Sequence, residues 1–262
     1  MSGPTRFPEL NAVLDELVSS VRAILGDNFC GAYLQGSFAI GEADEFSDVD
    51  FIVVTNGGVT DEQLAALQTM HARIYGLESP WAQHLEGSYV PKDRLRHVDP
   101  DRTQFLFLDN GATELVLDDH CNTAVVRWVL REHGVVLAGP DPASLVDPVA
   151  PEQLREEAHC GIGPYVEWAH EGAMSRWKQP YLVLTFCRML HTLHAGVVTS
   201  KRKAAEWALE ALDPVWASLI QRAIDDRPDP WDRVHQSAEA ELVARTRAFA
   251  SYAASSAGAP TR

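Results

Sequence analysis

Two aspartates one residue apart, Asp48 and Asp50, are the side chains of this sequence best suited to chemistry. Asp50 opens the apolar segment 50–55, whose composition predicts a β-strand. Side chains two apart along a strand point to the same face. Neighbouring carboxylates repel each other unless a cation joins them, and Mg²⁺ binds carboxylates together with substrate phosphate oxygens. The pair therefore predicts a magnesium site for phosphoryl or nucleotidyl transfer.

A glycine and a serine, Gly36 and Ser37, stand before this pair and follow the apolar run 30–34, a second expected strand. Small residues let the backbone approach a phosphate, and the N–H groups at a helix start favour anions. The Ser37 hydroxyl adds one more donor. Either feature alone is common in turns and at strand ends. Their combination, strand, Gly-Ser, nine residues, Ser-Asp-x-Asp, strand, is far more specific for nucleotide chemistry.

A third acid, Glu86, lies in the segment 84–90, which also has the composition of a strand. If that strand pairs beside the Asp50 strand, Glu86 faces the same site. It could then be the general base that takes a proton from a hydroxyl, a third metal ligand, or both. A solvated strand acid is the alternative.

Helical and strand patterns alternate in the first half of the chain. Apolar residues recur at helical spacing over 9–25, and helices are also expected over 61–75 and 121–133. A fourth strand is expected within 113–117. The proline-rich segment 139–151 is a stiff connector, because proline fixes φ and removes a donor.

The second half carries few strand signals. Helices are expected over 152–170, 181–195, 201–212 and 231–252. The sequence therefore predicts an α+β chain with two domains. Residues 1–150 form an α/β domain with a small mixed sheet, and residues 151–262 form an all-α helical bundle.

The amino-acid composition limits the kinds of ligand and site that are expected. The net charge of −15 disfavours a general nucleic-acid surface, which depends on Lys and Arg, and suits a small cationic ligand. Four scattered cysteines argue against a zinc site and a disulfide framework. No signal peptide and no membrane-spanning segment are expected, so we predict a cytoplasmic protein. The oligomeric state is not predictable from these features.

Taken together, the segment 36–50 resembles the signature of the DNA polymerase β-like nucleotidyltransferases. The rest of the chain resembles one branch of that superfamily, the aminoglycoside 3″-adenylyltransferases, which modify streptomycin and spectinomycin. Beyond the first domain, the resemblance rests on the motifs LREHGVVLAGP at 130–140, LVLTFCR at 182–188, Ser200-Lys201 and AAEWA at 204–208.

The resemblance implies AMP transfer from ATP, with Mg²⁺, to a hydroxyl of an aminoglycoside or aminocyclitol that enters between the two domains. It assigns metal binding to Asp48 and Asp50 and the catalytic base to Glu86, which also counts as a metal ligand. The implied nucleotide-binding residues are Gly36, Ser37, Ser47 and Lys201.

The acceptor residues depart from the family pattern. Where streptomycin-modifying members carry a Trp and two Asp, this chain has Trp168, Glu171 and, at the second Asp position, Lys178. A cationic drug beside Lys178 would be repelled. Spectinomycin therefore remains an expected acceptor, together with a non-antibiotic metabolite or a protein hydroxyl. A nucleotide-binding module without activity is the alternative outside enzymes.

Overall fold

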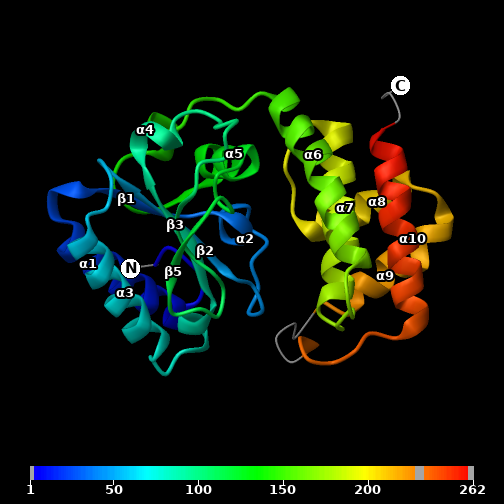
Figure 1. Cartoon of the computed structure of the whole chain (residues 1–262), viewed down its shortest axis with the longest axis horizontal. Helices are drawn as coiled ribbons and strands as arrows, with labels where there is room; N and C mark the ends of the chain where they lie inside the picture. Colours follow the sequence, from blue (N-terminus) through cyan, green and yellow to red (C-terminus); the bar gives the residue numbers. More distant parts are fainter. Residues whose placement is uncertain (1–2, 228–232, 259–262) are drawn as a thin grey trace. The chain divides into compact units, whose positions relative to one another are not determined.

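The computed structural model describes residues 3–227 and 233–258. The chain divides into two compact units, Met1–Val149 and Ala150–Arg262, one residue before the boundary expected from the prolines (Figure 1). The first unit is a sheet covered by helices, and the second is helical. This is the α+β class predicted from the sequence.

The sheet of the first unit has six strands among the described residues, in the order β5-β4-β3-β2-β1-β6. β2 and β3 are parallel and every other neighbouring pair is antiparallel, so the sheet is mixed, as predicted. The strands are β1 (Phe29–Leu34), β2 (Val49–Thr55), β3 (Leu85–Pro91), β4 (Phe105–Leu108), β5 (Leu115–Asp118) and β6 (Val135–Ala138).

Two of these strands, β4 and β6, were not expected. Each has only four residues in a continuous apolar run, so neither shows the alternation that marks a half-buried strand. Pairing with β3 and β1 supplies the hydrogen bonds that such short segments cannot specify locally. β5 corresponds to the fourth strand expected within 113–117.

Helices cover both faces of the sheet. Buried residues of α1 and α3 pack with Val49, Phe51 and Val53, whereas Ile52 and Val54 pack on the opposite face with residues of α5. Asp50 alternates with the first set along β2, so it belongs to the α5 face. The helices of this unit are α1 (Pro8–Leu25), α2 (Gly36–Ala39), α3 (Asp61–Tyr75), α4 (Lys92–Leu95) and α5 (Ala124–His133), with 3₁₀ turns at Gly26–Asn28, Pro80–His84 and Pro142–Ser144.

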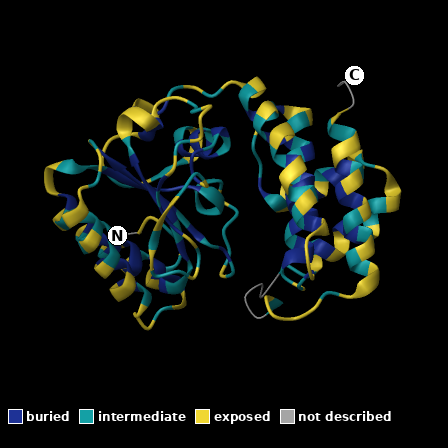
Figure 2. Cartoon of the chain, in the orientation of Figure 1, coloured by how far each residue is buried: buried dark blue, intermediate teal, exposed yellow. Residues whose placement is uncertain are grey.

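The second unit packs its helices around a separate core that includes Leu182, Phe186 and Phe249 (Figure 2). α7 lies at the centre and contacts α6, α8, α9 and α10. The helices are α6 (Pro151–His170), α7 (Lys178–Ala195), α8 (Lys201–Ala211), α9 (Ala217–Asp225) and α10 (Ala240–Ala257), with a 3₁₀ turn at Pro214–Trp216.

The helix expected over 231–252 is wrong at its start. Residues 231–232 lie outside the described part of the chain, and 233–239 form no α-helix. Instead, Ser237 pairs with Ser175 in an isolated bridge, and α10 begins at Ala240. α9 was not expected. Its apolar side chains Leu219, Ile220 and Ala223 are fully buried, and this tertiary packing is the source of most helical stability in a segment so short.

Candidate active site

The backbone of Gly36 lies directly against the Asp50 carboxylate. β1 ends at Leu34, and the N–H of Gln35 donates to the Asp50 carbonyl at 2.9 Å. Gly36 then begins α2 with a φ of +58°, a conformation that side chains rarely adopt. A Cβ there would lie 2.6 Å from Cγ of Asp50. Only glycine therefore allows this approach, which explains its position in the motif.

Glu86 lies directly beside Asp50. β2 and β3 run parallel, and their register pairs Asp50 with Glu86. Paired residues on neighbouring strands point to the same face of a sheet. The side chain of Glu86 is 14% exposed, so its carboxylate is largely enclosed but still reachable. The structure thus places Glu86, the predicted base, next to Asp50, which is the strand pairing on which that prediction depended.

Asp48 immediately precedes β2 and is positioned by an amide. Asn110 Nδ2 donates to Asp48 Oδ1 at 2.6 Å, and the Oδ1 of Asn110 lies 3.1 Å from Nδ1 of His84. Asn110 follows β4, a strand that the sequence pattern did not predict. Asn110 therefore joins the neighbourhood of Asp48 through tertiary contacts alone.

Glu86 has its own partner, His120. Nε2 of His120 lies 3.0 Å from Oε1 of Glu86. This hydrogen bond is the main cause that raises the pKa of His120, although burial acts in the opposite direction. Burial, followed by the charge of Glu86, raises the pKa of Asp109. The carboxylates at this edge therefore form a strongly negative environment that favours cations.

The carboxylates of Asp48 and Asp50 would suit Mg²⁺ together with oxygens of a substrate phosphate. Among the residues that the structure describes, no group of three or more His, Cys, Asp or Glu side chains could hold a metal ion. Metal binding by Asp48, Asp50 and Glu86 stays a prediction, and Glu86 pairs with His120 in this structure. Mg²⁺ commonly takes only one or two carboxylates and completes its shell with phosphate oxygens and water.

The two serines of the motif have different surroundings. Ser37 is the second residue of α2, where backbone N–H groups point outward from the helix start. The Ser47 hydroxyl donates to Asp44 Oδ1 at 3.0 Å and accepts from the Asp44 N–H at 3.0 Å. Ser47 therefore closes the loop before β2. A direct contact of Ser47 with nucleotide stays a prediction.

The remaining predicted residues lie in the helical unit. Lys201 is the first residue of α8, and its Nζ lies 4.1 Å from the ring centroid of Tyr181. Nζ of Lys178 lies 4.8 Å from the ring centroid of Trp168 and donates to the Glu171 carbonyl at 3.1 Å. Burial lowers the pKa of Lys178. The three predicted acceptor residues are therefore mutual neighbours.

Aromatic rings surround these lysines. Trp177 and Tyr181 stack with centroids 5.1 Å apart, and Trp168 meets the Tyr181 ring edge-on at 5.7 Å. All three rings are partly exposed. Such a cluster offers flat apolar faces and cation-binding surfaces to a sugar-like ligand.

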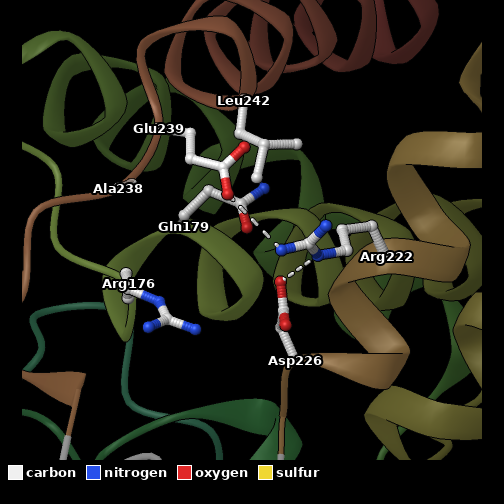
Figure 3. A pocket seen from close by; sticks show the side chains of 7 residues that line it. All are labelled: Arg176, Gln179, Arg222, Asp226, Ala238, Glu239 and Leu242. Carbon is white, nitrogen blue, oxygen red and sulfur yellow. Dashed lines mark hydrogen bonds and ion pairs between the residues drawn. The ribbon is translucent and has the colours of Figure 1, made fainter.

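A small cavity in the helical unit contains none of the predicted site residues. Figure 3 shows it lined by Arg176, Gln179, Arg222, Asp226, Ala238, Glu239 and Leu242. Its volume of about 10 Å³ is near the minimum for one water molecule. Arg222 is paired there with both Asp226 and Glu239. The cavity is thus a structural ion-pair site.

Comparison with known families gives the same division of the chain. Residues 18–92 match the nucleotidyltransferase domain, and residues 144–254 match the aminoglycoside adenylyltransferase C-terminal domain. The chain is therefore similar to the aminoglycoside adenylyltransferases in its second part and to nucleotidyltransferase domains in its first. The first match contains Gly36, Asp50 and Glu86, and the second contains Lys178 and Lys201.

Relatives cover most of the length of this chain. A spectinomycin 9-adenylyltransferase of Staphylococcus aureus is 25% identical over 236 residues, 84% of this chain and 87% of the relative. An aminoglycoside (3″)(9) adenylyltransferase of Escherichia coli is 24% identical over 82% of this chain and 84% of the relative. The fold resembles the crystal structure of an Enterococcus spectinomycin adenyltransferase with ATP and spectinomycin (TM-score 0.71, 16% identity), covering 93% of this chain and 98% of that chain.

No helix among the described residues is both long and apolar enough to span a membrane.

Two residues near the candidate site, Asn110 and His120, were not predicted from the sequence. Both follow short strands in polar turns, Asp109-Asn110-Gly111 and Asp118-Asp119-His120. The turn composition is visible in the sequence, but its proximity to Asp48 and Glu86 is not.

Proposed function

We propose that this protein transfers AMP from ATP to a hydroxyl of an aminoglycoside or aminocyclitol antibiotic, such as spectinomycin or streptomycin, and releases pyrophosphate. The observation that carries the proposal is the register of β2 with β3, which sets Glu86 beside Asp50. A base and a phosphate-associated carboxylate on adjacent strands are the elements that transfer to a hydroxyl requires. The family relatives named above act on such acceptors.

The residues divide the reaction between them. Glu86 accepts the proton of the acceptor hydroxyl, whose oxygen forms a bond to the α-phosphorus as the bond to the β-phosphate oxygen breaks. Backbone N–H groups at α2 and the Ser37 hydroxyl bind the triphosphate. Lys201 contributes a positive charge toward the nucleotide, and pyrophosphate leaves with the bonding electrons.

Magnesium is part of the proposal. Asp48 and Asp50 would hold the ion, with Asn110 orienting Asp48. When bound, Mg²⁺ neutralises triphosphate charge and polarises the α-phosphate for attack. The close packing of Asp50 on Gly36 keeps this carboxylate at the point where α2 begins.

The base assignment is tested by Glu86→Gln, which keeps the shape of the side chain and removes its basicity. We expect kcat to fall about 10²- to 10⁴-fold, because a positioned general base contributes that much, while ATP affinity stays within about twofold of the wild type. Glu114→Gln, at an exposed acid of the same unit, is the matched control. Full activity of the Glu86 variant would rule out its role as the base.

For the acceptor, the surroundings of Lys178 favour spectinomycin over streptomycin. The ammonium of Lys178 already lies on the Trp168 ring, so a guanidinium group brought there meets a like charge. A non-antibiotic metabolite or a protein hydroxyl is the second candidate class, because the same lysine departs from the family pattern.

The acceptor class is decided by incubating the protein with labelled ATP and a panel of aminoglycosides, metabolites, proteins and tRNA. We expect label on spectinomycin. Thermal unfolding with Mg-ATP and each drug provides a second measure, since a ligand of the native state raises its stability. Label that appears only on a protein or metabolite would move the proposal to that class.

A further inference from the structure

His120 contacts the proposed base and does not belong to the nucleotide motif. It lies two residues beyond the end of β5, in the turn that leads to α5. Its Nε2 is 3.0 Å from Oε1 of Glu86. We infer that His120 is a positioning residue, which holds one oxygen of Glu86 so that the other faces the acceptor hydroxyl. This inference rests on the proposed function.

Two contacts hold the imidazole itself in place. Its ring stacks on Phe107, with centroids 5.0 Å apart and an interplanar angle of 27°. The backbone N–H of His120 donates to Asp118 Oδ1 at 2.7 Å, which tightens the turn after β5. Phe107 is buried and pairs with Ser88, two residues beyond Glu86 on β3. The imidazole is therefore attached to the same sheet as the base.

Glu86 needs such a contact because glutamate is long and flexible. Fixing its side chain costs conformational entropy, and three rotatable bonds separate its carboxylate from the strand. Asp50, in contrast, is shorter and lies against Gly36. A hydrogen bond to one carboxylate oxygen removes most of the freedom of Glu86 and leaves the second oxygen available to the substrate.

The exposed fractions of the Glu86 and His120 side chains agree with a positioning role for His120. The Glu86 side chain is 14% exposed and that of His120 is 54% exposed, so His120 lies on the outer side of the base. The hydrogen bond of the imidazole is made to Oε1 of Glu86. His120 thus acts through Glu86. A misplacement of about 1 Å at the base can cost about 10²-fold in rate.

Two substitutions separate the hydrogen bond from the ring. His120→Phe keeps the aromatic ring that stacks on Phe107 and removes the donor. His120→Gln keeps an N–H donor at about the reach of Nε2 and removes the ring. We expect His120→Phe to lower kcat about 10- to 100-fold with the KM for ATP and acceptor nearly unchanged. We expect His120→Gln to stay within about threefold of the wild type.

A double-mutant cycle tests whether His120 acts through the base. In a Glu86→Gln background, His120→Phe should cause no further loss, because the oxygen it orients no longer takes a proton. Near-wild-type kcat in His120→Phe overturns the inference. Equal losses in the Phe and Gln variants also overturn it, because the ring rather than the donor would then matter. Circular dichroism and thermal unfolding check that each variant folds.

A second measurement is independent of turnover. In protein labelled with ¹⁵N-histidine, the Nε2–H of His120 should give a protected, hydrogen-bonded resonance that disappears in Glu86→Ala. Its absence from the wild type would contradict the contact itself. If the resonance is present but the wild type transfers AMP to no acceptor, the proposed function fails, and with it the role of His120 in catalysis.

Discussion

The Asp50 carboxylate and the Gly36 backbone lie so close that position 36 has no room for a side chain. Asp50 is on a central strand with neighbours on both sides, so its backbone is held by β1 and β3. Gly36 has a positive φ and begins a helix of only four residues. Gly36, which has no side chain, therefore leaves the space that the Asp50 carboxylate occupies.

Gly36→Ala tests this arrangement. The added methyl group would overlap the Asp50 carboxylate and strain the backbone at φ +58°. We expect AMP transfer to fall at least about 10²-fold, since small displacements at a reacting centre have effects of that size.

Gly41→Ala is the matched control in steady-state kinetics. Gly41 also has a positive φ, of +75°, but a Cβ there would meet nothing within 4 Å. Strain alone would slow both variants equally. Equal losses would contradict a specific role for the Gly36–Asp50 contact.

Among the elements, α4 and α5 are joined by a buried arginine. Arg127 on α5 is 1% exposed and donates to the carbonyls of Leu95 and Arg94 at 3.1 and 2.9 Å. It also donates to Asn122 Oδ1 at 2.7 Å. The Arg127 guanidinium thus donates to acceptors at the end of α4 and in the turn before α5. These acceptors have no partner within a helix.

Arg127→Met should destabilise the protein by about 3 kcal/mol, because several buried acceptors lose their donor at once. Urea unfolding followed by circular dichroism gives the free energy of unfolding. Arg202→Met is the control, since Arg202 is 70% exposed and pairs with Glu206 only one helical turn away. Its removal should cost less than about 0.5 kcal/mol. A similar loss in both variants would contradict the assignment.

A second inter-element contact joins α3 to β3. Nε2 of His71 lies 2.7 Å from the Tyr89 hydroxyl, and both side chains are buried. Burial lowers the pKa of His71 to about 4. The folded state therefore keeps His71 neutral at a pH where the unfolded chain, with an ordinary pKa of about 6.5, takes up a proton.

The sign of the pH effect follows from proton uptake. Between about pH 6.5 and 4 the unfolded state binds more protons, so stability from His71 is complete above pH 6.5 and declines as pH falls. The shift corresponds to about 3 kcal/mol. In His71→Gln, the slope of unfolding free energy against pH should flatten over this range. His159→Gln, at an exposed site, should leave the slope unchanged.

At the scale of the whole molecule, the net charge of −15 acts on every ligand that approaches. A cationic acceptor is attracted and ATP is repelled, and salt weakens both effects. The Debye length falls from about 30 Å at 0.01 M to about 8 Å at 0.15 M ionic strength.

We therefore expect kcat/KM for a cationic aminocyclitol to fall several-fold over that range of ionic strength. With saturating acceptor, kcat/KM for ATP should stay constant or rise. Steady-state kinetics at fixed Mg²⁺ measures both. A parallel fall for ATP and acceptor would show that salt acts on the fold or on the metal rather than on the approach of substrate.

The proposed reaction centre and the division into two parts were predictable from local patterns in the sequence. Gly36, Asp48, Asp50 and Glu86 are recognisable because glycine turns, acid spacing and strand composition are local properties. The same holds for α1 and α3, whose amphipathic patterns are long enough to specify a helix. The family resemblance then extended the prediction to the helical unit.

The residues that surround this proposed centre depend on tertiary contacts. β4 and β6 are too short to show a pattern, and their pairing depends on strands far along the chain. Asn110 and His120 reach Asp48 and Glu86 across 62 and 34 residues of sequence, respectively. Contacts at such separations result from sheet order and register. No local spacing encodes sheet order or register, so the surroundings of Glu86, the proposed base, are visible only in the folded chain.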